Sequence, residues 1–334
     1  MIVDFLSQTV YQRVIVGTSV IGATCGFLGT FTYLRRQSLI ADVVGHSSML
    51  GVTSAYLLSV LLLGIDGRSI VPIIVICALV GVLSAFLTST LSRFRRVGLD
   101  AAMAVVLALT FGGGMVIMAE IRLRPFPSSR AGLEDYLFGN ATTLTWSDIS
   151  LSAICAVIAV MLILVMWRDI ALLVFDRSNA HVMGRPVSFI EMTLVGATVV
   201  GIVIGLKAVG LVLVVAYVIL PPAAARQWTR HLGTMSCLSA FLGLVASLVG
   251  ALLSVMLGKV PSGPLTVIVL TVFTLFSMVA APRRSLIVRA IRRAEARRRL
   301  AGELQNRGPS QASTRHSADL SYAANACAVT ERRA

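Results

Sequence analysis

The amino-acid sequence predicts an all-α polytopic membrane protein with about nine transmembrane helices, and three observations support this fold class. Of the 334 residues, 57% are hydrophobic and only 13% are charged, whereas soluble domains carry about 25% charged residues. Aromatic residues contribute only 7%, so the apolar content is mainly aliphatic, which favours helices in lipid over a β-barrel with aromatic girdles. Apolar segments of about 20 residues, the length that spans a bilayer as a helix, recur along the chain and are separated by arginines and turn residues.

The individual helices follow from these apolar segments. Turn signals separate several of them, notably Gly64–Gly67, Pro125–Pro127 and Pro261–Pro264. The sixth and seventh segments are separated only by Leu206–Ala208, so one kinked segment followed by a short one is an alternative, and the total lies between about eight and ten. The nine expected helices are 14–34, 39–63, 69–91, 101–120, 148–167, 187–206, 209–225, 234–257 and 264–281.

The distribution of basic residues predicts the orientation. The net charge of +14 could indicate nucleic-acid binding, but the arginines flank apolar segments, as the positive-inside rule describes. With nine spans the N-terminus lies outside and the C-terminus in the cytoplasm. A group of arginines at 122–130 falls on the outer side, so a re-entrant piece within 121–147 stays possible. The basic residues on the cytoplasmic side are Arg35, Arg36, Arg93, Arg95, Arg96, Arg168, Arg177, Arg185, Arg226, Arg230 and those of the C-terminal tail.

Three regions are expected along the chain. Residues 1–282 form the transmembrane domain, 283–300 form a basic amphipathic helix on the cytoplasmic membrane surface, and 301–334 form a disordered tail. Four of the five cysteines lie in apolar segments and no CxxC pair occurs, so they are interpreted as small packing residues rather than a disulfide framework.

One pair of ionisable residues inside an apolar segment stands out. Asp42 and His46 are four residues apart in the second segment, so a helix places them on the same face. A carboxylate oxygen and an imidazole nitrogen that converge provide half of a site for a first-row divalent metal ion. A plain Asp–His hydrogen bond that ties helices together is the alternative.

Three other charged residues and one glycine run in the spans each have a structural interpretation, and two of these features also have a functional one. Glu120 ends the fourth span and is either an ordinary helix-end charge or a weaker metal-attracting group at the outer mouth. Glu191 is expected at the interface, and Lys207 is expected at a turn with its amine reaching toward water. The run Gly112–Gly114 indicates either close helix packing or an irregular stretch that lines a path.

The polar segment 167–186 between two spans is expected to lie in the cytoplasm. Asp176 or Ser178 would cap a short helix that ends at Gly184, with Pro186 after it. A short rigid helix there would suit contact with a motor subunit. His181 in this segment is expected to be a surface histidine. The sequence contains neither GxxxxGK[ST] nor HExxH, which argues against ATP hydrolysis by a phosphate loop and against a zinc protease.

Four stretches, in order, resemble the permease family of bacterial ATP-binding-cassette importers for manganese, zinc and iron. They are Arg35–Gly51, similar to "RR-x-x-L-x-x-D-x-x-x-H-x-x-x-x-G"; Glu134–Asn140, similar to "YLFGN"; Phe175–Gly184, similar to "FD…A…G"; and Gly210–Arg226, similar to "VG-x-LL…IPAA-x-A-R".

The resemblance implies a permease fold of the vitamin B12 and metal type in the bacterial inner membrane. It implies that the chain is not an enzyme, since a separate ATP-binding cassette ATPase subunit would hydrolyse ATP. Further partners would be an extracytoplasmic metal-binding protein and a second permease, identical or a paralogue, and the substrate would be manganese, zinc or iron. It places the metal path at Asp42 and His46. Contact with the ATPase would fall on Phe175, Asp176, Ala180 and Gly184.

A secondary metal-ion transporter driven by an ion gradient is the alternative function. Such transporters are often built from inverted repeats, and the sequence shows no convincing internal repeat. A membrane enzyme or scaffold is disfavoured because a catalytic constellation is missing from the sequence.

Overall fold

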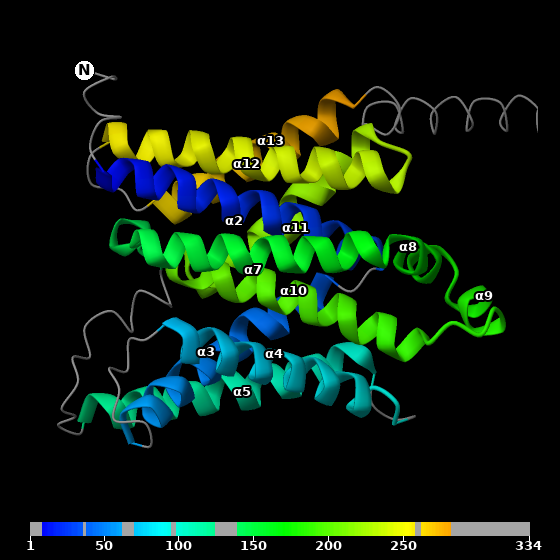
Figure 1. The fold of residues 1–334 in the computed structure, drawn as a ribbon, viewed down its shortest axis with the longest axis horizontal. Helices are drawn as coiled ribbons and strands as arrows, with labels where there is room; N and C mark the ends of the chain where they lie inside the picture. The colour runs from blue at the N-terminus through cyan, green and yellow to red at the C-terminus, as the bar shows by residue number, and fades with distance from the viewer. Residues whose placement is uncertain are drawn as a thin grey trace, which may run out of the picture. The chain divides into compact units, whose positions relative to one another are not determined.

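A computed structural model describes residues 9–35, 38–61, 70–94, 98–123, 139–257 and 262–281. The chain divides into two compact units, residues 1–278 and 279–334, and the first contains the helices discussed below (Figure 1). The expected basic helix 283–300 and the expected tail 301–334 lie outside the described residues.

Every regular element in the described part of the chain is helical, as the sequence predicts. Three elements are short: η1 (Ala141–Thr143), α8 (Trp167–Phe175) and α9 (Arg177–Val182). The long helices are α2 (Thr9–Leu34), α3 (Ser38–Leu61), α4 (Ile70–Leu91), α5 (Leu99–Leu123), α7 (Trp146–Val165), α10 (Val187–Val209), α11 (Leu211–Trp228), α12 (Leu232–Leu257) and α13 (Ser262–Ala280).

Each of the nine expected helices corresponds to one of these long helices. Eight are long and apolar enough to cross a membrane, and α11 is the ninth long helix of the described residues. The sixth and seventh segments are two helices rather than one kinked segment. Gly210 alone separates α10 from α11, and its φ of 88° lies in the left-handed region that glycine adopts readily.

Helix α2 lies at the centre of one group of helices and packs against α12, α11, α10 and α7. Its glycines permit close backbone approach, which supplies cohesion between helices in lipid. A Cβ atom at Gly22 would lie 2.5 Å from the carbonyl oxygen of Gly243, and one at Gly26 would lie 2.5 Å from that of Ser239. The helices therefore touch through their backbones at these positions.

Helices α3, α4 and α5 form a second group (Figure 1). A Cβ atom at Gly51 would lie 2.7 Å from the Cα atom of Cys77, and one at Gly114 would lie 2.6 Å from the backbone nitrogen of Leu50. Of the two interpretations of Gly112–Gly114, the irregular stretch does not hold, because α5 is continuous through these residues. Gly114 has a packing role instead.

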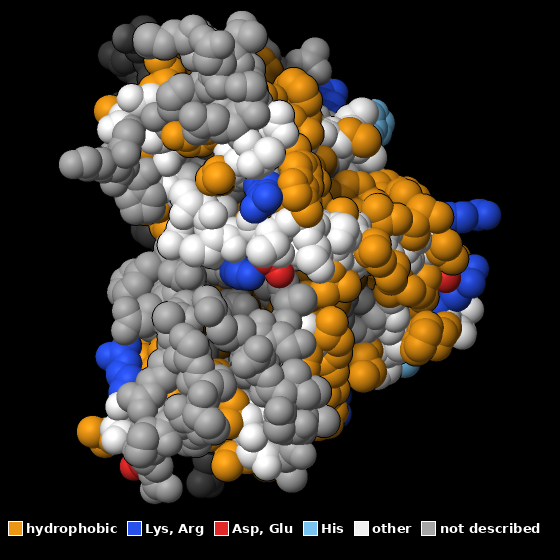
Figure 2. All heavy atoms as spheres, turned by 60° about the vertical axis from the view of Figure 1, so that its left-hand side comes forward, with side chains coloured by type: hydrophobic (Ala, Val, Ile, Leu, Met, Phe, Trp, Pro, Cys, Tyr) orange, Lys and Arg blue, Asp and Glu red, His pale blue; other side chains and the backbone are white. Residues whose placement is uncertain are grey.

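The outer surface of the helices is largely apolar. On α4, the exposed hydrophobic side chains recur every four residues or so, at Val71, Val75, Leu79, Leu83 and Phe86. Figure 2 shows hydrophobic side chains in a broad orange area on the face in view, with Lys and Arg at its edge. A helix face of this kind suits contact with lipid.

Two consecutive prolines, Pro221 and Pro222, lie inside α11. Each proline lacks the N–H that would bond the carbonyl four residues earlier. Helix α13 supplies nearby hydroxyl groups: Thr274 donates a hydrogen bond of 3.3 Å to the Leu220 carbonyl, and Ser277 donates one of 2.8 Å to the Ala224 carbonyl. These bonds attach α13 to the proline-containing part of α11.

Candidate functional site

The candidate metal ligands lie in the first three turns of α3. The Nε2 atom of His46 lies 3.3 Å from the Oδ1 atom of Asp42, and the two side chains are 23% and 37% exposed. Both residues belong to one helix, so a bond between them would join no second helix. Because an α-helix rises about 1.5 Å per residue, the pair lies about 6–12 Å from the start of α3.

The surroundings of the pair fix the imidazole ring. The ring of Phe111 in α5 meets that of His46 edge-to-face at 5.3 Å. The Nδ1 atom of His46 is buried without a hydrogen-bond partner, so Nε2 is the nitrogen that faces the carboxylate. Ser47 and Ser48 are buried and donate to carbonyls of α3 itself, which leaves Asp42 and His46 as the ionisable groups on this half-exposed face.

The structure does not bring Glu120 to this pair. Helices α3 and α5 run in parallel, since His46 contacts Phe111 and Gly114 packs against Leu50. Glu120 lies six residues beyond Gly114, so it is exposed farther along the bundle. Within the described residues, no group of three or more His, Cys, Asp or Glu side chains could hold a metal ion. Asp42 and His46 therefore offer two candidate ligands and no third from the described part of the chain.

The second candidate site is residues 175–184, here called the coupling segment. Of the two expected caps, Asp176 is the one observed: its side chain accepts a hydrogen bond of 2.9 Å from the Asn179 backbone N–H at the start of α9. The helix ends at Val182, two residues before the expected Gly184. Ala180 is fully buried, and Gly184 adopts a φ of 70° at the turn that follows. Phe175 is exposed.

The side chains of Val182 and Met183 are also exposed, as is that of His181. Phe175, Val182 and Met183 are thus exposed apolar side chains among exposed polar ones, on a segment anchored by the buried Ala180. Large apolar side chains exposed outside the membrane spans make this segment a candidate protein–protein contact.

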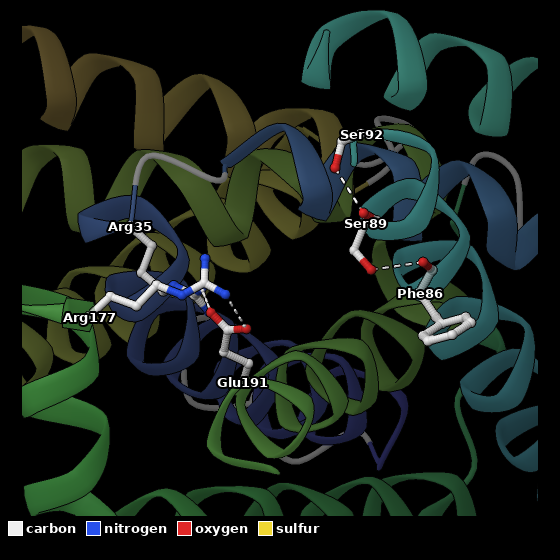
Figure 3. A network of polar contacts seen from close by, with 6 residues as sticks. All are labelled: Arg35, Phe86, Ser89, Ser92, Arg177 and Glu191. Atoms are coloured by element: carbon white, nitrogen blue, oxygen red, sulfur yellow. Dashed lines mark hydrogen bonds and ion pairs between the residues drawn. The ribbon is translucent and has the colours of Figure 1, made fainter. Parts of the chain in front are cut away.

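Glu191 forms an ion-pair cluster that the sequence reasoning missed. Its Oε1 atom lies 2.5 Å from the Arg35 guanidinium and its Oε2 atom lies 3.1 Å from that of Arg177. Figure 3 shows the three side chains converging from different elements. The serine bonds also drawn there, from Ser89 to Phe86 and from Ser92 to Ser89, are ordinary bonds near the end of α4.

Lys207 also departs from the expectation. It lies in the last turn of α10 rather than at a turn, and its Nζ atom is 2.5 Å from Oδ2 of Asp148, which is buried at the start of α7. The backbone N–H of Asn140 donates to the Lys207 carbonyl at 3.1 Å. The Lys207 amine is therefore paired inside the protein, whereas the sequence predicted that it reaches toward water.

Comparison with known proteins identifies the family. The family model described as "ABC 3 transport family" matches residues 7–281, most of the chain. The chain belongs to the ABC 3 transport family.

Two relatives of this ABC 3 chain extend the match. It is 35% identical to the manganese transport system membrane protein MntC of Bacillus subtilis, over 87% of this chain and 66% of that protein. It is 31% identical to the zinc transport system membrane protein TroC of Treponema pallidum, over 86% of this chain and 94% of that protein.

A solved structure shares the ABC 3 chain's fold. PsaBC from Streptococcus pneumoniae, solved in complex with a Fab, superposes with a TM-score of 0.74 at 24% identity, and covers 85% of this chain and 98% of that chain. An inward-facing metal-chelate type ABC transporter superposes with a TM-score of 0.55 at 15% identity, over 80% and 84% of the two chains. The expected permease fold is thereby confirmed, and the chain is a multi-pass membrane component of a transporter.

Proposed function

We propose that this chain is the membrane-spanning permease of an ATP-driven importer for divalent metal ions. The observation that carries the proposal is the Asp42–His46 pair, whose oxygen and nitrogen converge at 3.3 Å on a half-exposed face of a helix long enough to span a membrane. Imidazole and carboxylate are ligands that manganese, iron and zinc all accept. The relatives support this substrate class, since their names specify manganese, zinc and chelated iron.

Two candidate ligands call for further ones. Zinc takes about four ligands and manganese about six, so a second permease that contributes its own Asp and His, together with waters, would complete a site between two copies. The exposure of Asp42 in a single chain agrees with this arrangement. Whether the second copy is identical or a paralogue does not alter the chemistry.

The proposed orientation puts the coupling segment in the cytoplasm. The helix ends that carry Arg35, Arg93, Arg185 and Arg226 lie at one end of the bundle, because successive helices alternate in direction. Positive charge concentrates on the cytoplasmic side of membrane proteins. A separate ATPase would then bind the exposed apolar side chains of the coupling segment, and an extracytoplasmic binding protein would deliver the ion at the opposite end.

The test is Mn²⁺ uptake into vesicles that contain the chain with its cognate ATPase and binding protein. We expect uptake that requires ATP and that falls about tenfold or more in Asp42→Asn and in His46→Gln, because each change removes a metal ligand. Asp100→Asn serves as the control: it removes an exposed carboxylate from the first turn of α5 and should preserve uptake.

Two results would contradict the proposal. Undiminished uptake by correctly assembled Asp42→Asn would remove the metal site from the path. Uptake by the chain alone, without the ATPase and driven by a proton or sodium gradient, would instead favour the secondary transporter.

A further inference from the structure

Glu191 connects two elements that are far apart in the sequence. It lies in the first turns of α10, and each of its carboxylate oxygens serves a different arginine (Figure 3). Arg35 follows the last residue of α2, and Arg177 is the first residue of α9 in the coupling segment. One carboxylate therefore joins the coupling segment to two membrane-spanning helices.

The two halves of this cluster differ in burial. The Arg35 side chain is 10% exposed and that of Glu191 is 23% exposed, whereas that of Arg177 is 66% exposed. Burial lowers the pKa of the Arg35 guanidinium, and the Glu191 carboxylate opposes this shift. The Arg35–Glu191 pair is thus the inner, more buried link, because a buried charge is costly without its partner. The more exposed Arg177 connects the coupling segment to that pair through Glu191.

A further ion pair among the described residues of this region connects differently. Arg185 lies 3.2 Å from Asp169 in α8, so this pair closes the stretch 167–186 on itself. The backbone N–H of Arg185 also donates to the Ala180 carbonyl, at 3.1 Å. These bonds make the stretch internally rigid, while the Arg177–Glu191 pair leads from it to a spanning helix.

The inner end of the cluster lies close to the start of α3. Arg35, together with Ala41 and Val44 of α3 and Leu194 of α10, lines a small cavity. Ala41 and Val44 flank Asp42 and belong to the buried side of α3. Closely packed protein interiors have low compressibility and transmit displacements between neighbouring elements. A displacement of Glu191 and Arg35 can therefore reach the helix that carries Asp42 and His46.

We propose that Glu191 is a positioning residue that transmits movement of the coupling segment to the metal-binding helix. The inference rests on the proposed function, since it assumes an ATPase that acts on the coupling segment. In this mechanism Arg177 moves with α9, Glu191 follows it, and Arg35 passes the shift to the first turns of α3, which it lies against. Such a step needs two alternative packings of these elements.

The test compares Arg177→Gln and Glu191→Gln with Arg168→Gln in the full complex with ATPase and binding protein. Arg168 is an exposed arginine of the same stretch that lies outside the cluster. Mn²⁺ uptake and ATP hydrolysis are measured on the same vesicles. We expect Arg177→Gln to keep ATPase association and hydrolysis while the Mn²⁺ moved per ATP falls about tenfold, within the usual range of coupling between sites.

The control substitutions separate transmission from other roles. Arg168→Gln should behave as the unmodified protein, and Arg177→Lys should recover most of the transport because a lysine can still pair with Glu191. An unchanged Mn²⁺-to-ATP ratio in Arg177→Gln would overturn the inference. So would loss of ATPase association, which would make Arg177 a docking contact. Since Arg177 is exposed, folding of this variant is preserved even where Glu191→Gln is unstable.

Hydrogen exchange on the full-length chain without partners provides a readout that is independent of transport. Amides of residues 177–184 should exchange faster in Arg177→Gln than in Arg168→Gln, because the link to α10 is cut. Unchanged exchange would overturn the proposed link itself. Failure of the unmodified complex to move Mn²⁺ with ATP would count against the proposed function, while the exchange result would still decide whether the link exists.

Discussion

The amine of Lys207 lies 2.5 Å from the carboxylate of Asp148, and this ion pair joins the last turn of α10 to the first turn of α7. Asp148 has a second role there, because its side chain accepts a hydrogen bond of 3.0 Å from the Thr145 backbone N–H in a capping box. The carboxylate is buried and the amine is largely so. The Asp148 carboxylate therefore caps α7 and also holds the start of α7 against the end of α10.

Lys207→Met should destabilise the protein by about 3 kcal/mol, because it leaves the buried Asp148 carboxylate without its partner. Thermal unfolding in detergent, followed by loss of monodisperse protein, measures the effect. The double variant Lys207→Met/Asp148→Asn should lose less stability than Lys207→Met alone, since it leaves no unpaired charge. Equal losses in both variants would mean that the pair contributes through packing alone.

Gly22→Ala should weaken the contact between α2 and α12. The new Cβ atom would lie 2.1 Å from the Ser247 hydroxyl oxygen and 2.5 Å from the Gly243 carbonyl oxygen, and overpacking of this kind costs about 1–3 kcal/mol. Gly196→Ala is the matched control, because no heavy atom lies within 4 Å of its Cβ position. The control should be neutral or stabilising by up to about 1 kcal/mol, since alanine favours helix. Equal melting temperatures for the two variants would contradict the close approach.

Gly139→Ala and Gly184→Ala should differ although both glycines have positive φ. The values are 75° and 70°, and an alanine in the left-handed region costs about 1–2 kcal/mol. At Gly139 the Cβ atom would also lie 2.1 Å from the carbonyl carbon of Val209, whereas at Gly184 no heavy atom lies within 4 Å. Gly139→Ala should therefore reduce the melting temperature well beyond Gly184→Ala. The reverse order would refute this account of the contact beside Val209.

Val182→Asp should reduce co-purification of the ATPase. Val182 is exposed on the outer surface of the coupling segment, and a charge in the centre of an apolar protein interface is unfavourable. The loss should be about tenfold in apparent affinity, as for an interface residue worth about 1.4 kcal/mol. Ser150→Asp introduces the same charge on an exposed residue of α7, away from the coupling segment, and should leave the ATPase bound. Loss in both variants would indicate misfolding rather than a docking surface.

The sequence located the helices well because each depends on a local property. A run of about 20 apolar residues bounded by arginine or proline defines a span without reference to the rest of the chain. The cap at Asp176 was predictable for the same reason, since Asp176 and Asn179 are three residues apart. Asp42 and His46 were brought together by the helical repeat alone.

The ion-pair clusters were not predictable, because their members come from distant parts of the chain. Arg35 and Glu191 are 156 residues apart, and Asp148 and Lys207 are 59 apart. Each looked like an ordinary charge at the end of a span. One signal was present: opposite charges near the ends of two spans, at the same end of a bundle, are within reach of each other, and ionisable groups near lipid tend to pair.

The junction at Gly210 has a consequence for how the protein is made. Gly205 packs against Val214, so the chain reverses direction across this one residue. A connection of this length leaves no loop that could wait in water while the next segment is synthesised. We therefore expect α10 and α11 to enter the membrane together as a hairpin, and a tag placed between them to impair assembly.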